Sequence, residues 1–457
     1  MSRRPPKSPA KSPAKSPAKR SAKPPAKPDI RPCSLPGEFE VTIHKIGGRG
    51  DGVAEFQGEA VFVPLSVPGD RVWVRVEGSR GDGVVARPME ILEPSPDRVE
   101  APCRHFGACG GCALQYSADP VYAAWKMELV RGPLARVGLG DVELAPLART
   151  GPGGRRRATF AARRIGRKGV MLGFNERQSN KIVGLEECAV LDSAIVAVIE
   201  PLRAALAGLD LPEGETVDIA VARLGTGLDM LLTGPASLTR EARERLGAFA
   251  EGIDLARLSW RPKASADSEP VAHRRAVLAR FGDADVPVPP AAFLQASRAG
   301  EEALVAAAVK AVGEAASVAD LFAGCGTFTF PLAARAAVHA VEGDAAALSA
   351  LTQAAHAQPG RRITTERRDL ARDPLTAKEL SRYQAVVFDP PRVGAGAQAD
   401  ALAQSSVPVA VGVSCNPATF ARDARRLVDG GFRLERVVPV DQFLWSPHVE
   451  LVGVFRR

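Results

Sequence analysis

A glycine-containing loop between an expected strand and an expected helix constrains the fold of this chain more than any other feature. Residues 320–328 read Asp-Leu-Phe-Ala-Gly-Cys-Gly-Thr-Phe. Gly324 and Gly326 let backbone N–H groups approach a ligand closely, because neither carries a side chain that would block it. Glu342 ends the next expected strand, where a carboxylate can accept hydrogen bonds from both hydroxyls of a ribose. The pattern is typical of a sheet that binds a nucleoside-containing cofactor.

Helices and strands alternate from residue 293 onward. The expected helices cover 296–312, 328–336, 345–357 and 417–428, and the expected strands cover 318–322, 338–341, 385–388 and 407–413. This alternation predicts an α/β fold with a doubly wound parallel sheet, which binds ligands beyond the carboxyl ends of its strands. The glycine pattern is shorter than the dinucleotide fingerprint and follows the acidic Asp320, which favours S-adenosylmethionine over NAD.

Three further motifs are expected at the same rim of the sheet. Residues 389–392 read Asp-Pro-Pro-Arg and place a carboxylate and a rigid turn beside the cofactor. Residues 414–417 read Ser-Cys-Asn-Pro, with Cys415 at a helix N-terminus, where the dipole can lower the pKa of a thiol below about 8.5. Cys415 is therefore a candidate nucleophile. Residues 448–450 read His-Val-Glu, and Glu450 is a candidate base.

The positive charge of the chain is concentrated in its first 32 residues, which hold ten basic side chains and one acid. The whole chain has 60 basic and 52 acidic residues, so the remainder is nearly neutral. Three Lys-Ser-Pro-Ala repeats predict a disordered tail over 1–36, which adds either salt-sensitive attraction to nucleic acid or only solubility. No apolar run approaches the ~20 residues of a membrane span, and no secretory signal is recognisable, which predicts a cytoplasmic protein without a membrane partner.

Short β runs separated by turns fill residues 37–97 and predict a small barrel of the oligonucleotide-binding type. The runs are expected at 38–44, 53–56, 60–64, 71–77 and 84–92. In the fourth run, Arg71, Trp73 and Arg75 share one face, which could hold RNA. We expect Trp73 to be packed in the protein rather than to bind RNA.

A basic stretch at 149–168 stands out within the mixed α/β region 119–292. It holds eight basic residues and no acid. A charge run is ordinarily a solvated face, but residues 158–162 alternate as in a strand and would present the arginines on ordered structure. We therefore expect this stretch to form a surface that contacts phosphates.

Three of the seven cysteines lie within ten residues of one another. Cys103, Cys109 and Cys112 occupy the glycine-rich loop 98–118, and Cys188 follows far downstream. In the absence of a secretory signal these thiols are expected to be reduced, and four thiolates can hold either zinc or an iron–sulfur cluster. The spacing alone does not choose between the two.

Together these motifs resemble those of the uracil-C5 RNA methyltransferases, and most closely the branch that acts on 23S ribosomal RNA. The resemblance runs from about residue 37 to the end and includes Phe293-Leu-Gln295, which resembles the F-x-Q element of that family. It implies a TRAM barrel at 37–97, a cysteine loop at 98–118, a central RNA-binding domain at 119–292 that contributes Cys188, and a class I (Rossmann-like) methyltransferase domain at 293–457. We expect such a protein to act as a monomer.

The same resemblance implies roles for individual residues. Those implied to line the S-adenosylmethionine site are Gln295, Phe322, Gly324, Gly326, Thr327, Glu342, Asp369 and Asp389. Those implied to hold a four-iron four-sulfur cluster are Cys103, Cys109, Cys112 and Cys188. Thr327 and Pro391 depart from the Asn and Ala that are frequent in the family, but neither departure removes a reacting group.

The implied chemistry is a covalent route to 5-methyluridine. Cys415 would add to C6 of the uracil, C5 would take the methyl group, and Glu450, ionised from a reference pKa of about 4.3, would remove the proton from C5. The base must first leave its stack, and Phe293 is either its stacking partner or a core residue.

Two other functions compete with this interpretation. The first is an amino-directed methyltransferase, because Asp-Pro-Pro-Arg is a variant of a motif that holds an exocyclic amine. That motif needs an aromatic residue where Arg392 stands, and it leaves Cys415 and Glu450 unused. The second is a non-catalytic RNA-binding or assembly protein, which the intact reactive residues disfavour.

Overall fold

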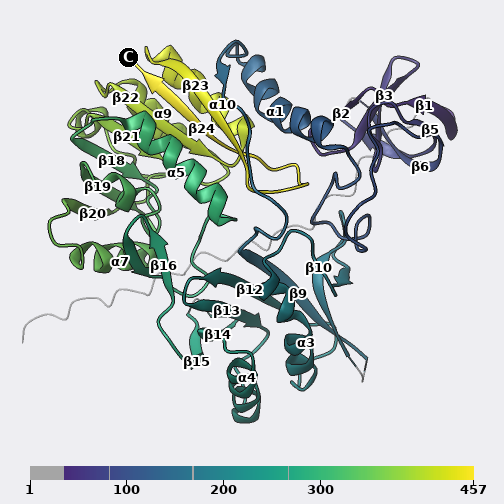
Figure 1. The fold of residues 1–457 in the computed structure, drawn as a ribbon, viewed down its shortest axis with the longest axis horizontal. Coiled ribbons are helices and arrows are strands. Elements are labelled where there is room, and N and C mark those ends of the chain that lie inside the picture. Colours follow the sequence, from purple (N-terminus) through teal and green to yellow (C-terminus); the bar gives the residue numbers. More distant parts are fainter. Residues whose placement is uncertain (1–34, 82, 167–168, 266) are drawn as a thin grey trace, which may run out of the picture.

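The computed structural model describes residues 35–81, 83–166, 169–265 and 267–457. The tail expected at 1–36 lies almost wholly outside the described residues, as do Arg167 and Lys168 of the basic stretch. Three large sheets follow one another along the described chain (Figure 1). None of the helices in this part of the chain is long and apolar enough to cross a membrane.

The first sheet has six strands in the order β1-β5-β6-β4-β3-β2. Their bounds are Glu38–Thr42 for β1, Lys45–Ile46 for β2, Gly52–Phe56 for β3, Glu59–Val63 for β4, Arg71–Arg80 for β5 and Gly83–Glu93 for β6. Five of the six strands were expected. The two-residue β2 was not expected, because so short a run cannot show the alternation of apolar and polar residues that marks a strand.

Strand β5 alternates as expected, but the expected packing of Trp73 is wrong. Val72 and Val74 are fully buried, whereas Trp73 is 38% exposed. The indole Nε1 of Trp73 donates to Glu38, and Arg75 also pairs with Glu38. The face that carries Trp73 is therefore a mixed-charge surface, because its arginines have carboxylate partners.

The second sheet, drawn in teal in Figure 1, has seven strands in the order β11-β10-β9-β12-β13-β14-β15. Its strands are β9 Arg157–Ile165, β10 Gly169–Asn175, β11 Ile182–Gly184, β12 Thr216–Leu224, β13 Gly227–Gly234, β14 Arg257–Pro262 and β15 Glu269–His273. The helices of this region are α2 Ser193–Ala197, α3 Ile199–Ala207 and α4 Arg240–Gly252, and the hairpin β16 Leu278–Phe281 with β17 Ala284–Pro287 follows.

The third sheet has the order β20-β19-β18-β21-β22-β24-β23-β7, with β8 also paired to β23. Its strands are β18 Ser317–Leu321, β19 Ala337–Glu342, β20 Ile363–Arg367, β21 Ala385–Phe388, β22 Val409–Ser414, β23 Arg433–Asp441 and β24 Glu450–Arg456, with β7 Glu143–Leu144 and β8 Ala148–Arg149. Strands β18 to β22 are parallel, as expected, whereas β24 lies antiparallel between β22 and β23.

Helices cover both faces of the third sheet, which confirms the expected doubly wound fold. They are α5 Arg298–Val312, α6 Thr329–Leu332, α7 Ala345–His356, α8 Ala377–Leu380, α9 Gly396–Ala403 and α10 Pro417–Asp429. The residues of the helix α1, Asp119–Arg136, were assigned to the central region, but Val130 and Leu134 of this helix pack in the core of the third sheet. Strands β7 and β8 pair with this sheet as well, so residues 119–149 are physically part of it.

Candidate active site

The expected rim residues meet at a cavity of about 500 Å³ between the second and third sheets. Cys415 follows β22, Glu450 opens β24, and Arg392 lies in the turn after β21. From the other side, Arg155, Arg157 and Phe293 line the same cavity. The topology thus brings the candidate nucleophile and the candidate base together, although 35 residues separate them in the chain.

The glycine loop after β18 has the backbone of a ligand cradle. Phe322, Gly324 and Gly326 all have positive φ values, of 62°, 56° and 102°. The N–H of Gly324 donates to Glu342 over 2.8 Å, so the loop is tied to the end of β19. A Cβ added to Gly324 would meet no atom within 4 Å, which leaves open space where a ligand would lie.

The other residues predicted for the cofactor site do not all contact one another. Asp389 accepts a hydrogen bond from Gln295 over 3.3 Å. Thr327 is half-buried in the glycine loop, and Asp369 is exposed and accepts from the N–H of Ala371 in the loop after β20. Asp320, outside the predicted set, is fully buried, and its Oδ1 has no hydrogen-bond partner among the described residues.

The environment of Cys415 differs from the one expected at a helix N-terminus. Asn416 caps α10 by accepting from the N–H of Ala418. Burial nevertheless raises the pKa of the Cys415 thiol, and together with the charges of the nearby Glu450 and Asp389 it brings that pKa to about 11. The expected lowering is therefore wrong, because burial and two acidic neighbours outweigh the dipole of the helix.

Glu450 is only 3% exposed. Burial raises the pKa of its carboxyl above the usual range, and the charge of Asp389 adds to the effect, whereas Arg157 and Arg392 oppose it. An ordinary, fully ionised glutamate was expected here. Instead, two neighbouring acids and two arginines share one buried site, so ionisation of Glu450 depends on its neighbours.

Arg157 and Phe293 form one wall of the cavity. The guanidinium of Arg157 lies 4.6 Å from the ring centre of Phe293, and Phe293 is 63% exposed, which excludes its interpretation as a core residue. The Nε of Arg157 is buried and has no hydrogen-bond partner within the described chain. A buried, unpaired donor beside Cys415 and Glu450 is suited to a polar atom of a ligand.

The basic stretch does not form one continuous surface. Arg149 makes two hydrogen bonds of 2.7 Å with Asp119, and Arg156 is paired with the buried Glu301. Arg156 also donates to the carbonyl of Gln295 over 3.0 Å. These two arginines hold parts of the fold together, which corrects the expectation of a single phosphate-contacting face. Whether Arg155 contacts phosphate stays a prediction.

Arg392 and His448, which belong to two separate motifs, contact each other at the cavity. The guanidinium of Arg392 lies 2.8 Å from Nδ1 of His448. Burial lowers the pKa of His448 to about 4, and the charge of Arg392 contributes. His448 is therefore neutral at physiological pH and accepts this hydrogen bond.

A buried cluster anchors the loop between β23 and β24. The Nζ of Lys126 on α1 donates to Asp441 over 2.7 Å and to the carbonyl oxygens of Phe443 and His448. The hydroxyl of Tyr122 donates to Asp441 over 2.5 Å. Since His448 and Glu450 follow this loop directly, α1 fixes the approach of both to the cavity.

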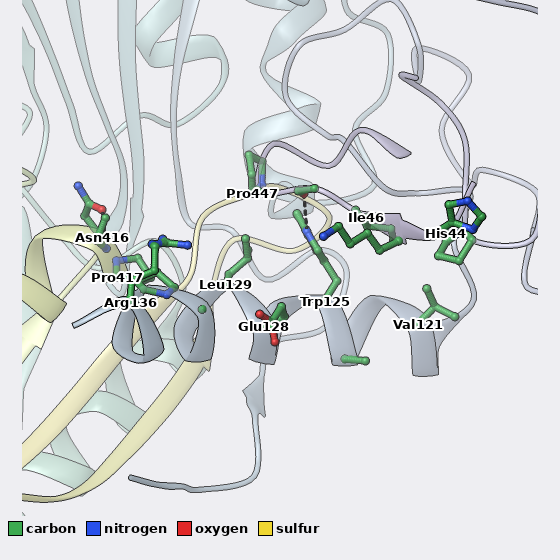
Figure 2. A pocket seen from close by; sticks show the side chains of 18 residues that line it. His44, Ile46, Val121, Trp125, Glu128, Leu129, Arg136, Asn416, Pro417 and Pro447 are labelled. Carbon is green, nitrogen blue, oxygen red and sulfur yellow. Dashed lines mark hydrogen bonds between the residues drawn. The ribbon is translucent and has the colours of Figure 1, made fainter. Parts of the chain in front are cut away.

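A larger groove of about 820 Å³ lies along α1 (Figure 2). It runs between α1 and the turn after β1, and Asn416 and Pro417 close one end of it. Because Cys415 lines the smaller cavity and Asn416 lines the groove, the turn at 415–417 separates the two.

The four predicted cluster cysteines come from two segments that lie against each other. Gly110 donates to the carbonyl of Asn175, and the N–H of Arg104 donates to Glu187, next to Cys188. The charges of Cys103, Cys109 and Cys188 all act on Cys112. Within the described residues, no three His, Cys, Asp or Glu side chains are arranged to hold a single metal ion.

Comparison with known proteins agrees with this architecture. A family model described as tRNA (uracil-5-)-methyltransferase matches residues 360–457. An RNA methyltransferase of Brucella suis is 46% identical over 92% of this chain and 98% of its own length. The 23S rRNA (uracil(1939)-C(5))-methyltransferase RlmD of Halomonas elongata is 34% identical over 91% of this chain and 88% of its own length. The chain belongs to the uracil-C5 RNA methyltransferase family.

A solved structure extends the likeness of this methyltransferase to the whole fold. The tRNA (uracil-54, C5)-methyltransferase of Pyrococcus abyssi, in complex with S-adenosyl-L-homocysteine, superimposes with a TM-score of 0.72. It covers 91% of this chain and 99% of its own, at 24% identity. At this identity the likeness shows the fold, and membership of the family makes the protein an RNA methyltransferase.

The sequence motifs missed three residues that line the active-site cavity or its edge. Arg157 was treated only as part of a charge run, and Arg392 only as the end of a turn. Gln442, which is 2% exposed, had no signal at all, because an isolated glutamine after an apolar strand has no pattern.

Proposed function

We propose that this methyltransferase converts a uridine of 23S ribosomal RNA to 5-methyluridine through a covalent adduct with Cys415. The observation that carries the proposal is the cavity that Cys415 and Glu450 line together. The residues proposed to bind S-adenosylmethionine are Gln295, Phe322, Gly324, Gly326, Thr327, Glu342, Asp369 and Asp389. The 34% identical 23S rRNA enzyme of Halomonas elongata supports the ribosomal substrate.

The proposed reaction begins when the thiol of Cys415 releases its proton to solvent and the thiolate Sγ forms a bond to C6 of the uracil. The C5–C6 π electrons then form an enolate with charge on O4, and the unpaired Nε of Arg157 is a donor for that oxygen. C5 attacks the sulfonium methyl group, and S-adenosylhomocysteine leaves. Glu450 takes the proton from C5, the C5–C6 double bond forms again, and the Sγ–C6 bond breaks.

The roles of Cys415 and Glu450 can be distinguished because their variants should stop the reaction at different steps. Cys415→Ala cannot form a bond to RNA, so neither product nor adduct should appear. Glu450→Gln retains the nucleophile but has no basicity near pH 7, so methyl transfer should occur and elimination should stall. With labelled S-adenosylmethionine and RNA, Glu450→Gln should accumulate a methylated protein–RNA species on denaturing gels.

Two results would contradict this assignment. Normal turnover by Cys415→Ala would remove covalent catalysis and favour the amino-directed alternative. Loss of activity in Glu450→Gln without an adduct would remove Glu450 as the base. Mass mapping of methyluridine in ribosomal RNA from a deletion strain would test the substrate separately, and an unchanged 23S pattern would exclude it.

We also propose that Cys103, Cys109, Cys112 and Cys188 hold a four-iron four-sulfur cluster. The thiols come from two hydrogen-bonded segments, the charges of the other three act on Cys112, and a four-iron cluster takes four thiolate ligands. The thiolates would orient the cysteine loop against the second sheet, which is a structural role.

A further inference from the structure

Gln442 directly follows β23, and the proposed reaction assigns it no role. Its side chain is fully enclosed and lines the active-site cavity beside Glu450. A Cβ added to Gly300 would lie 2.6 Å from the Cβ of Gln442, so the first turn of α5 packs tightly on it. The side chain therefore has little freedom to turn away from the cavity.

One backbone hydrogen bond determines which way the Gln442 amide points. The N–H of Ser297 donates to Oε1 of Gln442 over 3.3 Å, so Nε2 faces the opposite side. There it donates to Oε1 of Gln295 over 2.6 Å. With Oε1 of Gln295 engaged as an acceptor, Nε2 of Gln295 donates to Asp389 over 3.3 Å. This series of hydrogen bonds thus runs from Gln442 through Gln295 to Asp389.

The second proton on Nε2 of Gln442 is available to Glu450, which shares the cavity wall. This hydrogen bond lowers the pKa of Glu450 and opposes the effect of burial. The charged groups around Glu450 are Asp389 from the end of β21, Cys415 from the end of β22, Arg157 from β9 and Arg392 from the turn after β21. Gln442 is the neutral donor among them.

We infer that Gln442 is a positioning residue, which orients Glu450 for removal of the C5 proton and links it through Gln295 to Asp389 on the cofactor side. The inference rests on the proposed role of Glu450 as the eliminating base. An amide donor stabilises the ionised carboxylate without supplying a net charge that would compete with the substrate. The hydrogen bond therefore favours the ionised form of Glu450 and fixes the direction in which its carboxylate points before the adduct forms.

Gln442→Met tests the inference, because it keeps the length and volume of the side chain but removes the donor. Methyl transfer to the Cys415 adduct should proceed, whereas elimination should slow about 10- to 100-fold, the usual worth of a hydrogen bond to a charged group. Loss of the donor leaves the pKa of Glu450 higher. The pH midpoint of the elimination rate should therefore rise by about one unit.

Gln398→Met is the matched control. Gln398 is also buried beneath the third sheet and makes two hydrogen bonds with the backbone of Leu375, but it does not line the cavity. Gln398→Met should lose stability as Gln442→Met does. Its elimination rate should keep the pH midpoint of the wild type. If Gln442→Met does not fold, Gln442→Asn replaces it, since its shorter amide cannot reach both partners.

The outcomes separate this inference from the proposed function. If Glu450→Gln traps the adduct but the Gln442 variant eliminates at the wild-type rate and pH midpoint, the role of Gln442 is wrong. If Glu450→Gln traps no adduct, the assignment of the base itself is wrong. A slowed elimination with an unchanged pH midpoint would assign Gln442 to packing alone and would also overturn the inference.

Discussion

At the scale of single residues, the active site combines a poorly ionised thiol with two poorly ionised acids. Burial is the largest cause of the raised pKa of Cys415 and of Glu450, and each negative charge opposes the other. Such a site is most reactive once a positive group enters it, and the sulfonium of the methyl donor is one. The resting site is thereby protected from unproductive alkylation.

Alkylation of Cys415 by iodoacetamide should report this electrostatic coupling. Because only the thiolate reacts and the pKa is about 11, the rate should rise about tenfold per pH unit between pH 7 and 9. Glu450→Gln removes one opposing charge, lowers the pKa of the thiol and should speed the reaction at pH 9. Mass spectrometry of the Cys415 peptide measures both rates. A slower reaction in the variant would contradict the coupling.

The residue types at the site could be predicted, but their pKa values could not. Cys415 and Glu450 stand in recognisable motifs at strand ends, and the structure brings both to one cavity. The sign of the Cys415 shift could not be predicted, because it depends on Glu450 and Asp389, which only the folded sheet places nearby. Gln442 could not be predicted because its partners lie 145 and 147 residues away.

At the scale of elements, the glycine loop after β18 offers a sharp test of cofactor binding. A Cβ at Gly326 would lie 2.5 Å from the ring of Phe330, at a φ of +102°. Gly326→Ala should therefore distort the loop, which costs about 1–3 kcal/mol, and weaken binding of S-adenosylmethionine about tenfold or more. Isothermal titration calorimetry measures the affinity.

Gly360→Ala is the control for this substitution, because Gly360 has a φ of +90° but no atom within 4 Å of the added Cβ. It imposes comparable backbone strain outside the cofactor loop. Its affinity for S-adenosylmethionine should equal that of the wild type. Equal affinities for the two variants would mean that the loop does not hold the cofactor.

The anchor between α1 and the β23–β24 loop should dominate the stability of the third sheet. Lys126→Met leaves Asp441 buried without its cation, and breaking such a pair costs about 3–5 kcal/mol. Arg298→Ala removes an exposed i,i+4 pair with Glu302 and should cost less than about 0.5 kcal/mol. Chemical denaturation measures both losses. Similar losses would show that the anchor contributes little.

Sequence periodicity predicted most elements of the third sheet but not all of its boundaries. Strand β21 matches its expected bounds, because a fully buried apolar run has unambiguous ends. Strand β20 was missed, since Ile-Thr-Thr-Glu-Arg at the sheet edge is half-exposed and mostly polar. The attachment of α1 to this sheet was not predictable, because it depends on the distant Asp441.

At the scale of the whole molecule, the cysteine loop joins regions that are distant in the chain. Anaerobically purified protein should contain iron and sulfide in equal amounts, and Cys109→Ser should lose both together with its visible absorption. Cys325→Ser should retain them, because Cys325 is buried in the glycine loop instead. Stoichiometric zinc without iron would contradict the cluster, and a lower melting temperature in Cys109→Ser would support its structural role.

The position of β24 has a consequence for how the protein is made. This strand leaves the ribosome after every other strand of its sheet, yet it belongs between β22 and β23. Until it arrives, those two strands lack their shared partner and expose backbone edges that invite aggregation. The parallel strands β18 to β22 are therefore all synthesised before the strand that carries Glu450. A nascent chain could thus bind the methyl donor before it can complete a reaction on RNA.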